Sequence, residues 1–244
     1  MPHSTYEGGI YRREDFIIET KYGEVVDDNG RVTEKLSFAP DSIKKSLEIS
    51  LKRLNLEYID LFAAHGGTTE LFSEEFFQCL EDLKRQKLIR AFGINTFDTD
   101  VIKWIGADRR FDYVMLDYNI MRQDREPLIR LLYDNGIGVI GGAALAEGLY
   151  SKRKIKSIND LWYLLRAKVR FKEQSVTGRN YRFINGVQEM TGNQIALRFV
   201  LDNQFITTSV FNTTSPEHLL ENVKATDIRI PQQVKKRIIA VGNK

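Results

Sequence analysis

Short apolar runs alternate with amphipathic stretches along most of the chain. Apolar runs bounded by turn residues predict buried strands, and apolar positions three or four residues apart predict helices. The pattern predicts strands at Phe16–Lys21, Tyr58–Ala64, Ile89–Ile94, Tyr113–Tyr118, Ile137–Ala143 and Phe205–Phe211. It predicts helices at Ser42–Leu54, Glu74–Gln86, Thr99–Ile105, Glu126–Asn135, Asn193–Asp202 and, as the last clear one, Pro216–Val223. Asp41 is the expected N-cap of the first helix.

This alternation predicts an α/β fold with a parallel sheet whose strands are covered on both faces. A doubly wound sheet and a (β/α)₈ barrel both fit, but no Gly-x-Gly-x-x-Gly motif follows the first strand. Polar residues instead stand at the carboxyl ends of the strands, where the active sites of barrels are built. They are Lys21, His65, Asn95, Thr96, Asn119 and Asn212. We therefore expect one TIM-type barrel domain over residues 1–244, incomplete or open, with about six βα units.

The composition narrows the class of protein. The chain has 244 residues, of which 42% are hydrophobic and 28% charged, which is typical of a globular protein. The single cysteine, Cys79, cannot form an internal disulfide and indicates a reducing compartment. No apolar run is long enough to cross a membrane, and a net charge of +3 is too small to indicate nucleic-acid binding. We expect a cytoplasmic protein that acts on a small molecule.

The charge is unevenly distributed. Residues 151–182 contain ten basic and two acidic residues and so carry a net charge of about +8, within a basic insertion at about residues 151–190. A solvated loop and helix explains such a segment. A lid that attracts an anionic ligand is the alternative interpretation, and both stay open.

Several motifs, taken in order, closely resemble those of the aldo-keto reductase superfamily. They are Asp41–Glu48, Ser50–Leu54, Tyr58–His65, Leu80–Lys84, Ile89–Ile94 and Ser215–Asn222. The resemblance extends from about Phe16 to Thr226. It implies a (β/α)₈ barrel that binds NADP(H) at its carboxyl-terminal mouth and transfers hydride to a carbonyl, without a metal.

The resemblance also implies catalytic residues. The family uses an Asp, a Tyr, a Lys and a His, with the Tyr as proton donor, and Lys21 and His65 match the Lys and the His. Because a βαβ unit needs about 30 residues and 15 residues precede Phe16, we expect the chain to begin at the family's third strand. Ser4–Gly9 resembles the family's Tyr-Gly segment, and this resemblance makes Tyr6 the candidate acid, displaced from its usual place. Asp60, inside an apolar strand, is a candidate partner of Lys21, either in catalysis or in a structural ion pair.

The cofactor positions of the family are only partly matched. The pair that holds the nicotinamide carboxamide corresponds to Asn95 and Thr96, and Asn119 is polar at the next strand end. The amide partner corresponds to Met115 and the stacking aromatic to Gly142, and neither makes those contacts. Further positions correspond to Asn212, Thr213 and His218 for the ribose phosphate, and to Glu221 and Asn222 for the adenine side.

Three functions fit these residues. The first is an oxidoreductase related to the aldo-keto reductases, with an eroded tetrad and nicotinamide site. The second is a cofactor-independent lyase, dehydratase or isomerase that uses Lys21 and His65 on an anionic substrate. The third is a non-catalytic regulatory or structural partner. Six units leave the strands Phe16–Lys21 and Phe205–Phe211 at exposed edges, so we expect the N-terminal tail, the insertion or a second copy in a homo-oligomer to cover them.

Overall fold

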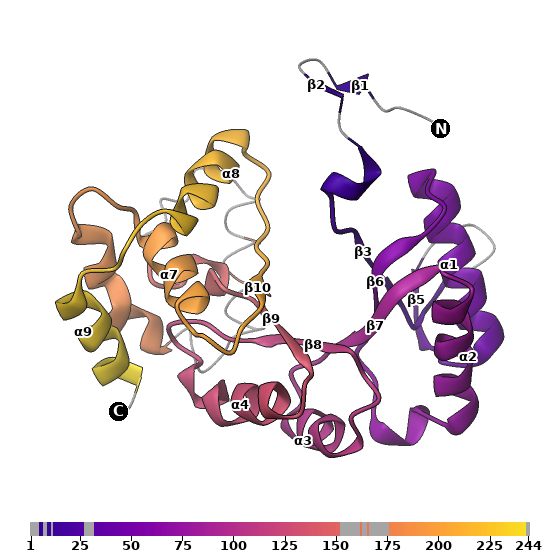
Figure 1. The fold of residues 1–244 in the computed structure, drawn as a ribbon. Coiled ribbons are helices and arrows are strands. Elements are labelled where there is room, and N and C mark those ends of the chain that lie inside the picture. The colour runs from indigo at the N-terminus through magenta and orange to yellow at the C-terminus, as the bar shows by residue number, and fades with distance from the viewer. Residues whose placement is uncertain are drawn as a thin grey trace. The chain divides into compact units, whose positions relative to one another are not determined.

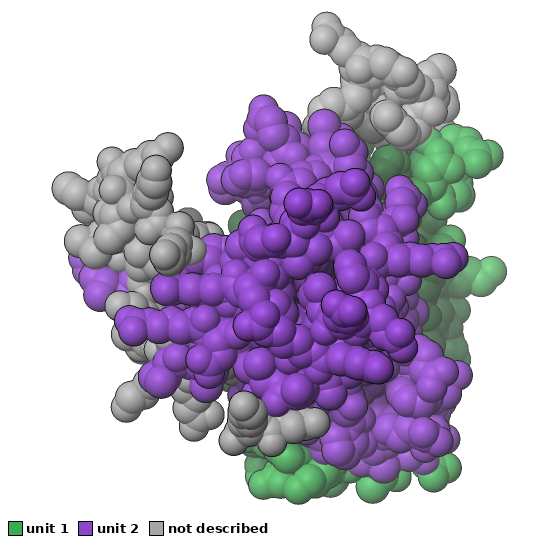
Figure 2. All heavy atoms as spheres, turned by 90° about the vertical axis from the view of Figure 1, so that its left-hand side faces the viewer, with its two compact units in different colours: residues 1–113 green, residues 114–244 purple. Residues whose placement is uncertain are grey.

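The chain forms two compact units, Met1–Tyr113 and Val114–Lys244, which Figure 2 colours separately. The structure, a computed structural model, describes residues 5–6, 9–10, 12–26, 32–151, 162, 165 and 176–242. Most of the basic insertion predicted at about residues 151–190 lies outside these residues. The single domain expected over residues 1–244 stays a prediction.

Unit 1 is built around three parallel strands. They are β3 (Glu19–Tyr22), β6 (Ile59–His65) and β7 (Ile89–Asn95), with β6 between the other two (Figure 1). The helices are α1 (Pro40–Leu54), α2 (Glu74–Arg85) and α3 (Thr99–Asp108). Two antiparallel pairs, β1 (Thr5–Tyr6) with β2 (Gly9–Ile10) and β4 (Glu24–Val26) with β5 (Val32–Leu36), complete the strands described in this unit.

Aromatic rings fill the space between the strands of unit 1 and its helices. The ring of Tyr22 lies 4.4 Å from that of Phe62 and 6.2 Å from that of Phe76. Phe76 belongs to α2, which begins where Ser73 Oγ accepts a hydrogen bond from the Phe76 N–H at 3.3 Å. Burying each such ring stabilises the unit by about 1.5–3 kcal/mol, so this face of the strands is the core face.

Unit 2 repeats the strand–helix arrangement. Its strands, in spatial order, are β8 (Tyr113–Asp117), β9 (Gly138–Gly142) and β10 (Thr208–Ser209). The first residue of β8, Tyr113, belongs to unit 1. Strands β9 and β10 are parallel. Its helices include α4 (Glu126–Asp134), α7 (Gly192–Leu201), α8 (Pro216–Val223) and α9 (Gln232–Gly242). Thr191 and Gln194 form a reciprocal capping box at the start of α7, as a Thr-x-x-Gln sequence favours.

Two predictions near the start of the chain were wrong. The first strand begins at Glu19 rather than Phe16, because Phe16 and Ile17 are exposed and Ile18 donates its N–H to the Asp60 carboxylate at 2.9 Å. The first helix has Ala39, not Asp41, as its N-cap, with proline next at position 40. Proline fits the first turn because it lacks the N–H that would be unpaired there.

The end of the chain also differs from the prediction. The predicted strand Phe205–Phe211 is reduced to two residues, because Asn203 Oδ1 accepts the Phe205 N–H at 3.0 Å and holds this segment in a turn. The last helix, α9, was not predicted. Only one side chain of α9, that of Ile238, is fully buried. The helical pattern of apolar residues that would predict this helix is therefore weak.

Candidate functional site

Lys21, His65 and Asn95 lie on one face of the unit 1 sheet. Because Tyr22 and Phe62 face the helices, the alternation of side chains places Lys21 and Ala63 on the opposite face. Lys21 pairs in register with Ala63, and two residues farther along, His65 pairs with Asn95. All three polar residues are therefore at the carboxyl ends of three adjacent parallel strands, the position that the sequence predicted.

The spacing between these strand ends suits one small substrate. Neighbouring strands are about 4.8 Å apart and rise about 3.3 Å per residue, which puts the Cα atoms of Lys21 and His65 roughly 8 Å apart. Lys21 is exposed, and the side chain of His65 is 43% exposed. An ammonium and an imidazole on the same exposed face can both reach one carbonyl oxygen.

His65 has a partner that the sequence analysis missed. Its Nδ1 lies 2.8 Å from Glu24 Oε1, and β4 supplies this glutamate. A carboxylate at Nδ1 holds the ring with the hydrogen on that nitrogen and leaves Nε2 as the proton acceptor. Glu24 follows Lys21 by three residues, but no sequence signal showed that the chain turns back toward the end of β6.

A second polar pair lies deeper on the same face. The Tyr113 hydroxyl donates to Glu19 Oε1 at 3.2 Å, and Tyr113 is 4% exposed. Burial raises the pKa of the Glu19 carboxyl, and the charge of Lys21 opposes that rise. The aromatic ring fits because Gly93 has no side chain: a Cβ there would lie 2.5 Å from the Tyr113 ring.

Gly93→Ala is accordingly expected to destabilise the protein. The added methyl must displace the Tyr113 ring, and overpacking of this kind costs about 1–3 kcal/mol. Gly186→Ala is the matched control, because nothing lies within 4 Å of the position its Cβ would take. The free energy of unfolding in urea measures both. Equal stability of the two variants would contradict the predicted clash.

Asp60 does not pair with Lys21, contrary to the expectation from the sequence. It stands at the amino end of β6, on the same face as Phe62, and is 3% exposed. Its carboxylate binds Arg13 at 2.6 Å, Arg90 at 2.9 Å and the Ile18 N–H at 2.9 Å. Asp60 thus stabilises the base of unit 1, by which we mean the amino ends of its strands. His65 lies at the opposite end of β6.

Tyr6, the candidate acid, is described only as part of β1. Its side chain lies outside the described part of the structure, and so do residues 152–161, 163–164 and 166–175 of the basic insertion.

The proposed carboxamide-binding residues are engaged in local contacts. Asn119 is completely buried, its Nδ2 donates to the Ala143 carbonyl at 3.1 Å and its Oδ1 accepts the Met121 N–H at 2.9 Å. Thr96 is buried, and its hydroxyl accepts the Asp98 N–H at 3.2 Å. Asn119 therefore supports the loops that follow β8 and β9.

The adenine-side positions are different. Asn222 is 3% exposed, and its Oδ1 is buried with no hydrogen-bond partner within the described residues. Glu221 accepts the Thr191 hydroxyl at 2.6 Å through its side chain and the Gln194 amide at 2.9 Å through its backbone carbonyl. Asn222 is thus a buried acceptor held beside a rigid network, whereas Asn212 and Thr213 are exposed.

Met115 and Gly142 offer no ring and no amide to a nicotinamide. A Cβ on Gly141 would meet Val200 of α7, so Gly141 faces the helix and Gly142 the opposite side. A Cβ on Gly142 would lie 3.3 Å from Met115 Cγ. This face of β8 and β9 is therefore crowded by a thioether side chain.

A buried ion cluster near the end of β8 was also not predicted. Asp117 is 2% exposed and binds Arg125 Nη2 at 2.9 Å and Arg122 Nη1 at 3.5 Å. Burial raises the pKa of Asp117, and the two arginines oppose that rise. An aspartate ending an apolar run, with arginines a few residues farther on, was its only sequence signal.

None of the helices in the described ranges is both long enough and apolar enough to cross a membrane. In the same ranges, no group of three or more His, Cys, Asp or Glu side chains is arranged to hold a metal ion.

Comparison with known proteins gives one consistent family. The model of the Aldo/keto reductase family matches residues 8–243. An uncharacterized oxidoreductase, YqkF, of Bacillus subtilis is 26% identical over 89% of this chain and 71% of its own length. The NADH-specific methylglyoxal reductase of Escherichia coli is 25% identical over 89% of this chain and 72% of its own.

A solved structure confirms the predicted fold class. The aldo-keto reductase AKR11C1 from Bacillus halodurans, in its holo form, matches with a TM-score of 0.75 and 24% identity. The match covers 94% of this chain and 74% of that protein. The fold is therefore α/β and of the TIM-barrel type.

Proposed function

Because the chain belongs to the aldo/keto reductase family, we propose that it reduces a carbonyl compound with NADP(H), using Lys21 and His65 at the carbonyl oxygen. The observation that carries this proposal is their common position. Both side chains are exposed and lie on one face of the unit 1 sheet, at the carboxyl ends of the adjacent strands β3 and β6. This is where barrels place their chemistry.

Lys21 and His65 have separate roles at the carbonyl oxygen of the substrate. Reduction of a carbonyl puts negative charge on that oxygen, and the Lys21 ammonium stabilises it through its own charge. The His65 imidazole, held at Nδ1 by Glu24, can carry a proton on Nε2 and deliver it to the oxygen. The cofactor, when bound, supplies the hydride.

The described residues fit this cofactor better at its adenine end than at its nicotinamide end. The orphaned Oδ1 of Asn222 suits the exocyclic amine of adenine, which is a hydrogen-bond donor. Met115 and Gly142 provide neither an amide nor a stacking ring at the other end. The adenine end is therefore expected to supply much of the affinity.

Isothermal titration of the protein with NADPH and NADH tests this proposal. Both are used because the Escherichia coli relative is described as NADH-specific. We expect saturable binding of at least one of them, weakened about tenfold in Asn222→Ala, since a lost hydrogen bond to a buried partner costs about 1–1.5 kcal/mol. Gln188→Ala, at an exposed position, should bind as the unmodified chain does. No detectable binding at millimolar cofactor would exclude the hydride-transfer function.

A second function is favoured by the Glu24–His65 pair. A carboxylate that orients a histidine produces a general base, and Lys21 on the same face supplies a cation or an amine nucleophile. These groups suit a lyase, dehydratase or isomerase that acts on an anionic substrate without a nicotinamide. Turnover in the complete absence of NADPH and NADH would support it over the reductase.

A further inference from the structure

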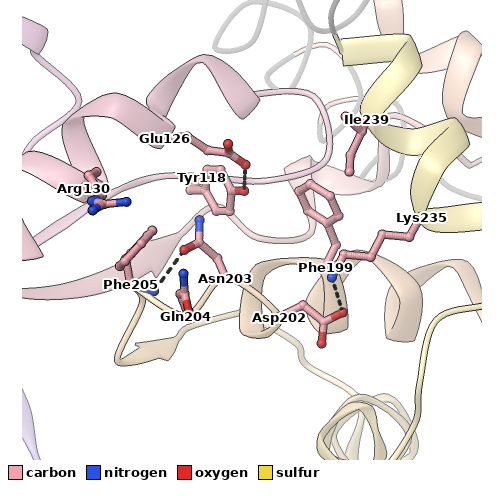
Figure 3. Close-up of a pocket in the computed structure, with 10 residues that line it drawn as sticks. All are labelled: Tyr118, Glu126, Arg130, Phe199, Asp202, Asn203, Gln204, Phe205, Lys235 and Ile239. Atoms are coloured by element: carbon pink, nitrogen blue, oxygen red, sulfur yellow. Dashed lines mark hydrogen bonds and ion pairs between the residues drawn. The ribbon is translucent and has the colours of Figure 1, made fainter. Parts of the chain in front are cut away.

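Unit 2 contains a cavity that takes no part in the proposed chemistry. It has a volume of about 440 Å³ and lies between α4, the connection from α7 to β10, and α9 (Figure 3). Its lining comes only from residues 118–239 and includes none of the candidate site residues. Small-molecule sites are typically about 300–1,000 Å³, so the cavity has the size of a site for a small organic ligand.

Aromatic rings form much of the wall. Tyr118 and Phe199 are almost completely buried and stack with 5.9 Å between ring centroids. Phe205 supplies a third ring, and Ile239, which is 40% exposed, stands at the edge. Figure 3 shows these side chains around the hollow. The cavity therefore has a partly apolar wall of aromatic and aliphatic carbon atoms.

Two cations and two carboxylates also line the cavity, and three of these four groups are neutralised. Asp202 is bound by Lys235 at 2.8 Å and by Arg198 at 2.7 Å. Arg130 is bound by Asp134 at 3.1 Å and lies over the Phe205 ring. The remaining carboxylate, Glu126, forms no ion pair within the described part of the chain.

The Glu126 carboxylate is nevertheless held in a fixed position. The Tyr118 hydroxyl donates a hydrogen bond to Glu126 Oε1 at 2.8 Å. Burial raises the pKa of Tyr118, so the phenol keeps its proton and continues to donate. This single hydrogen bond leaves further lone pairs of the carboxylate available for another donor.

We propose that this cavity binds a small organic ammonium ion, with its charge on Glu126 and its apolar body against Phe199 and Phe205. The carboxylate gives the ammonium a charge-assisted hydrogen bond, and the apolar wall accommodates the rest of the ligand. The two cations that line the cavity bind carboxylates other than Glu126: Arg130 binds Asp134, and Lys235 shares Asp202 with Arg198. The ligand is a primary amine with a body of about one ring.

Titration with three probes of the same size tests the proposal: benzylammonium, benzyl alcohol and benzoate. Benzylammonium is expected to bind at least tenfold more tightly than benzyl alcohol, and benzoate not at all. Glu126→Gln keeps a hydrogen-bond acceptor for Tyr118 but removes the charge, so it should abolish the preference for the ammonium. Glu81→Gln, at an exposed position on α2, should retain it.

Near-ultraviolet circular dichroism shows that each variant is folded before it is titrated. Equal binding of benzylammonium and benzyl alcohol would overturn the assignment, and so would an unchanged preference in Glu126→Gln or the absence of benzylammonium binding. None of these results depends on NADP(H) or on turnover, so the proposal stands or falls separately from the reductase function.

Discussion

Replacing His65 by alanine is expected to lower kcat/KM for carbonyl reduction by about 10²–10⁴-fold, the usual contribution of a positioned acid or base. The variant loses the imidazole at the carboxyl end of β6 while Glu24 loses only a surface partner, both groups being about two-fifths exposed. The fold should therefore be unchanged. Lys21→Met is expected to cause a loss of similar size, because it removes the ammonium proposed to stabilise the charge that develops on the carbonyl oxygen.

Steady-state rates measured by NADPH consumption check both variants, with cofactor affinity measured in parallel. Lys103→Met, on an exposed face of α3, is the matched control for Lys21 and should retain full activity. Glu24→Gln keeps a polar neighbour for the ring and should lose less activity than His65→Ala. Full activity in both His65→Ala and Lys21→Met would remove them from the mechanism.

Asp60→Ala is expected to lower the free energy of unfolding by about 3–5 kcal/mol, since removal of one partner leaves buried charge uncompensated. The carboxylate binds two arginines and a backbone N–H while it is 3% exposed. Arg13 is itself largely buried, so the variant leaves a guanidinium with too few acceptors. Urea unfolding followed by the fluorescence of Trp104, which stacks on Phe72 in the same unit, measures the loss.

Asp100→Asn is the control for this loss. Its ion pair with Lys103 is 3.4 Å long and highly exposed, and surface pairs contribute about 0–1 kcal/mol. A loss in Asp60→Ala no greater than in Asp100→Asn would show that the buried cluster does not hold the base of unit 1.

The strand ends were predictable because they depend on local pattern. Apolar runs fix the strands β6 and β7, and the polar residue that ends each run, His65 or Asn95, must stand at the carboxyl edge. Their common face follows from the period of two, once Phe62 is recognised as a core residue. This much of the candidate site needs no knowledge of long-range contacts.

The partners of these residues were not predictable for the opposite reason. Glu24 reaches His65 across 41 positions of sequence, and Arg13 reaches Asp60 across 47. Neither pairing produces a periodic pattern in the sequence from which it could be predicted. The expectation that Asp60 pairs with Lys21 failed because alternation on β6 places Asp60 on the face of Phe62, away from Ala63 and Lys21.

The cavity of unit 2 that is proposed to bind an ammonium ion could not be predicted from the sequence either. Tyr118 and Phe199 are 81 residues apart, and Glu126 reads as an ordinary first-turn glutamate that favours the helix dipole. What distinguishes Glu126 is that Arg130 and Lys235, which line the same cavity, form ion pairs with other carboxylates. Only the three-dimensional arrangement shows this.

The seven residues of β6 carry the buried anchor Asp60 at one end and His65, the residue proposed to act in catalysis, at the other. Asp60 and His65 are about 16 Å apart along the strand and share no described contact. Evolution can therefore change the reactive end without loosening the base. A variant that lacks His65 is therefore expected to keep its fold, which leaves the carboxyl end of β6 open to a different role.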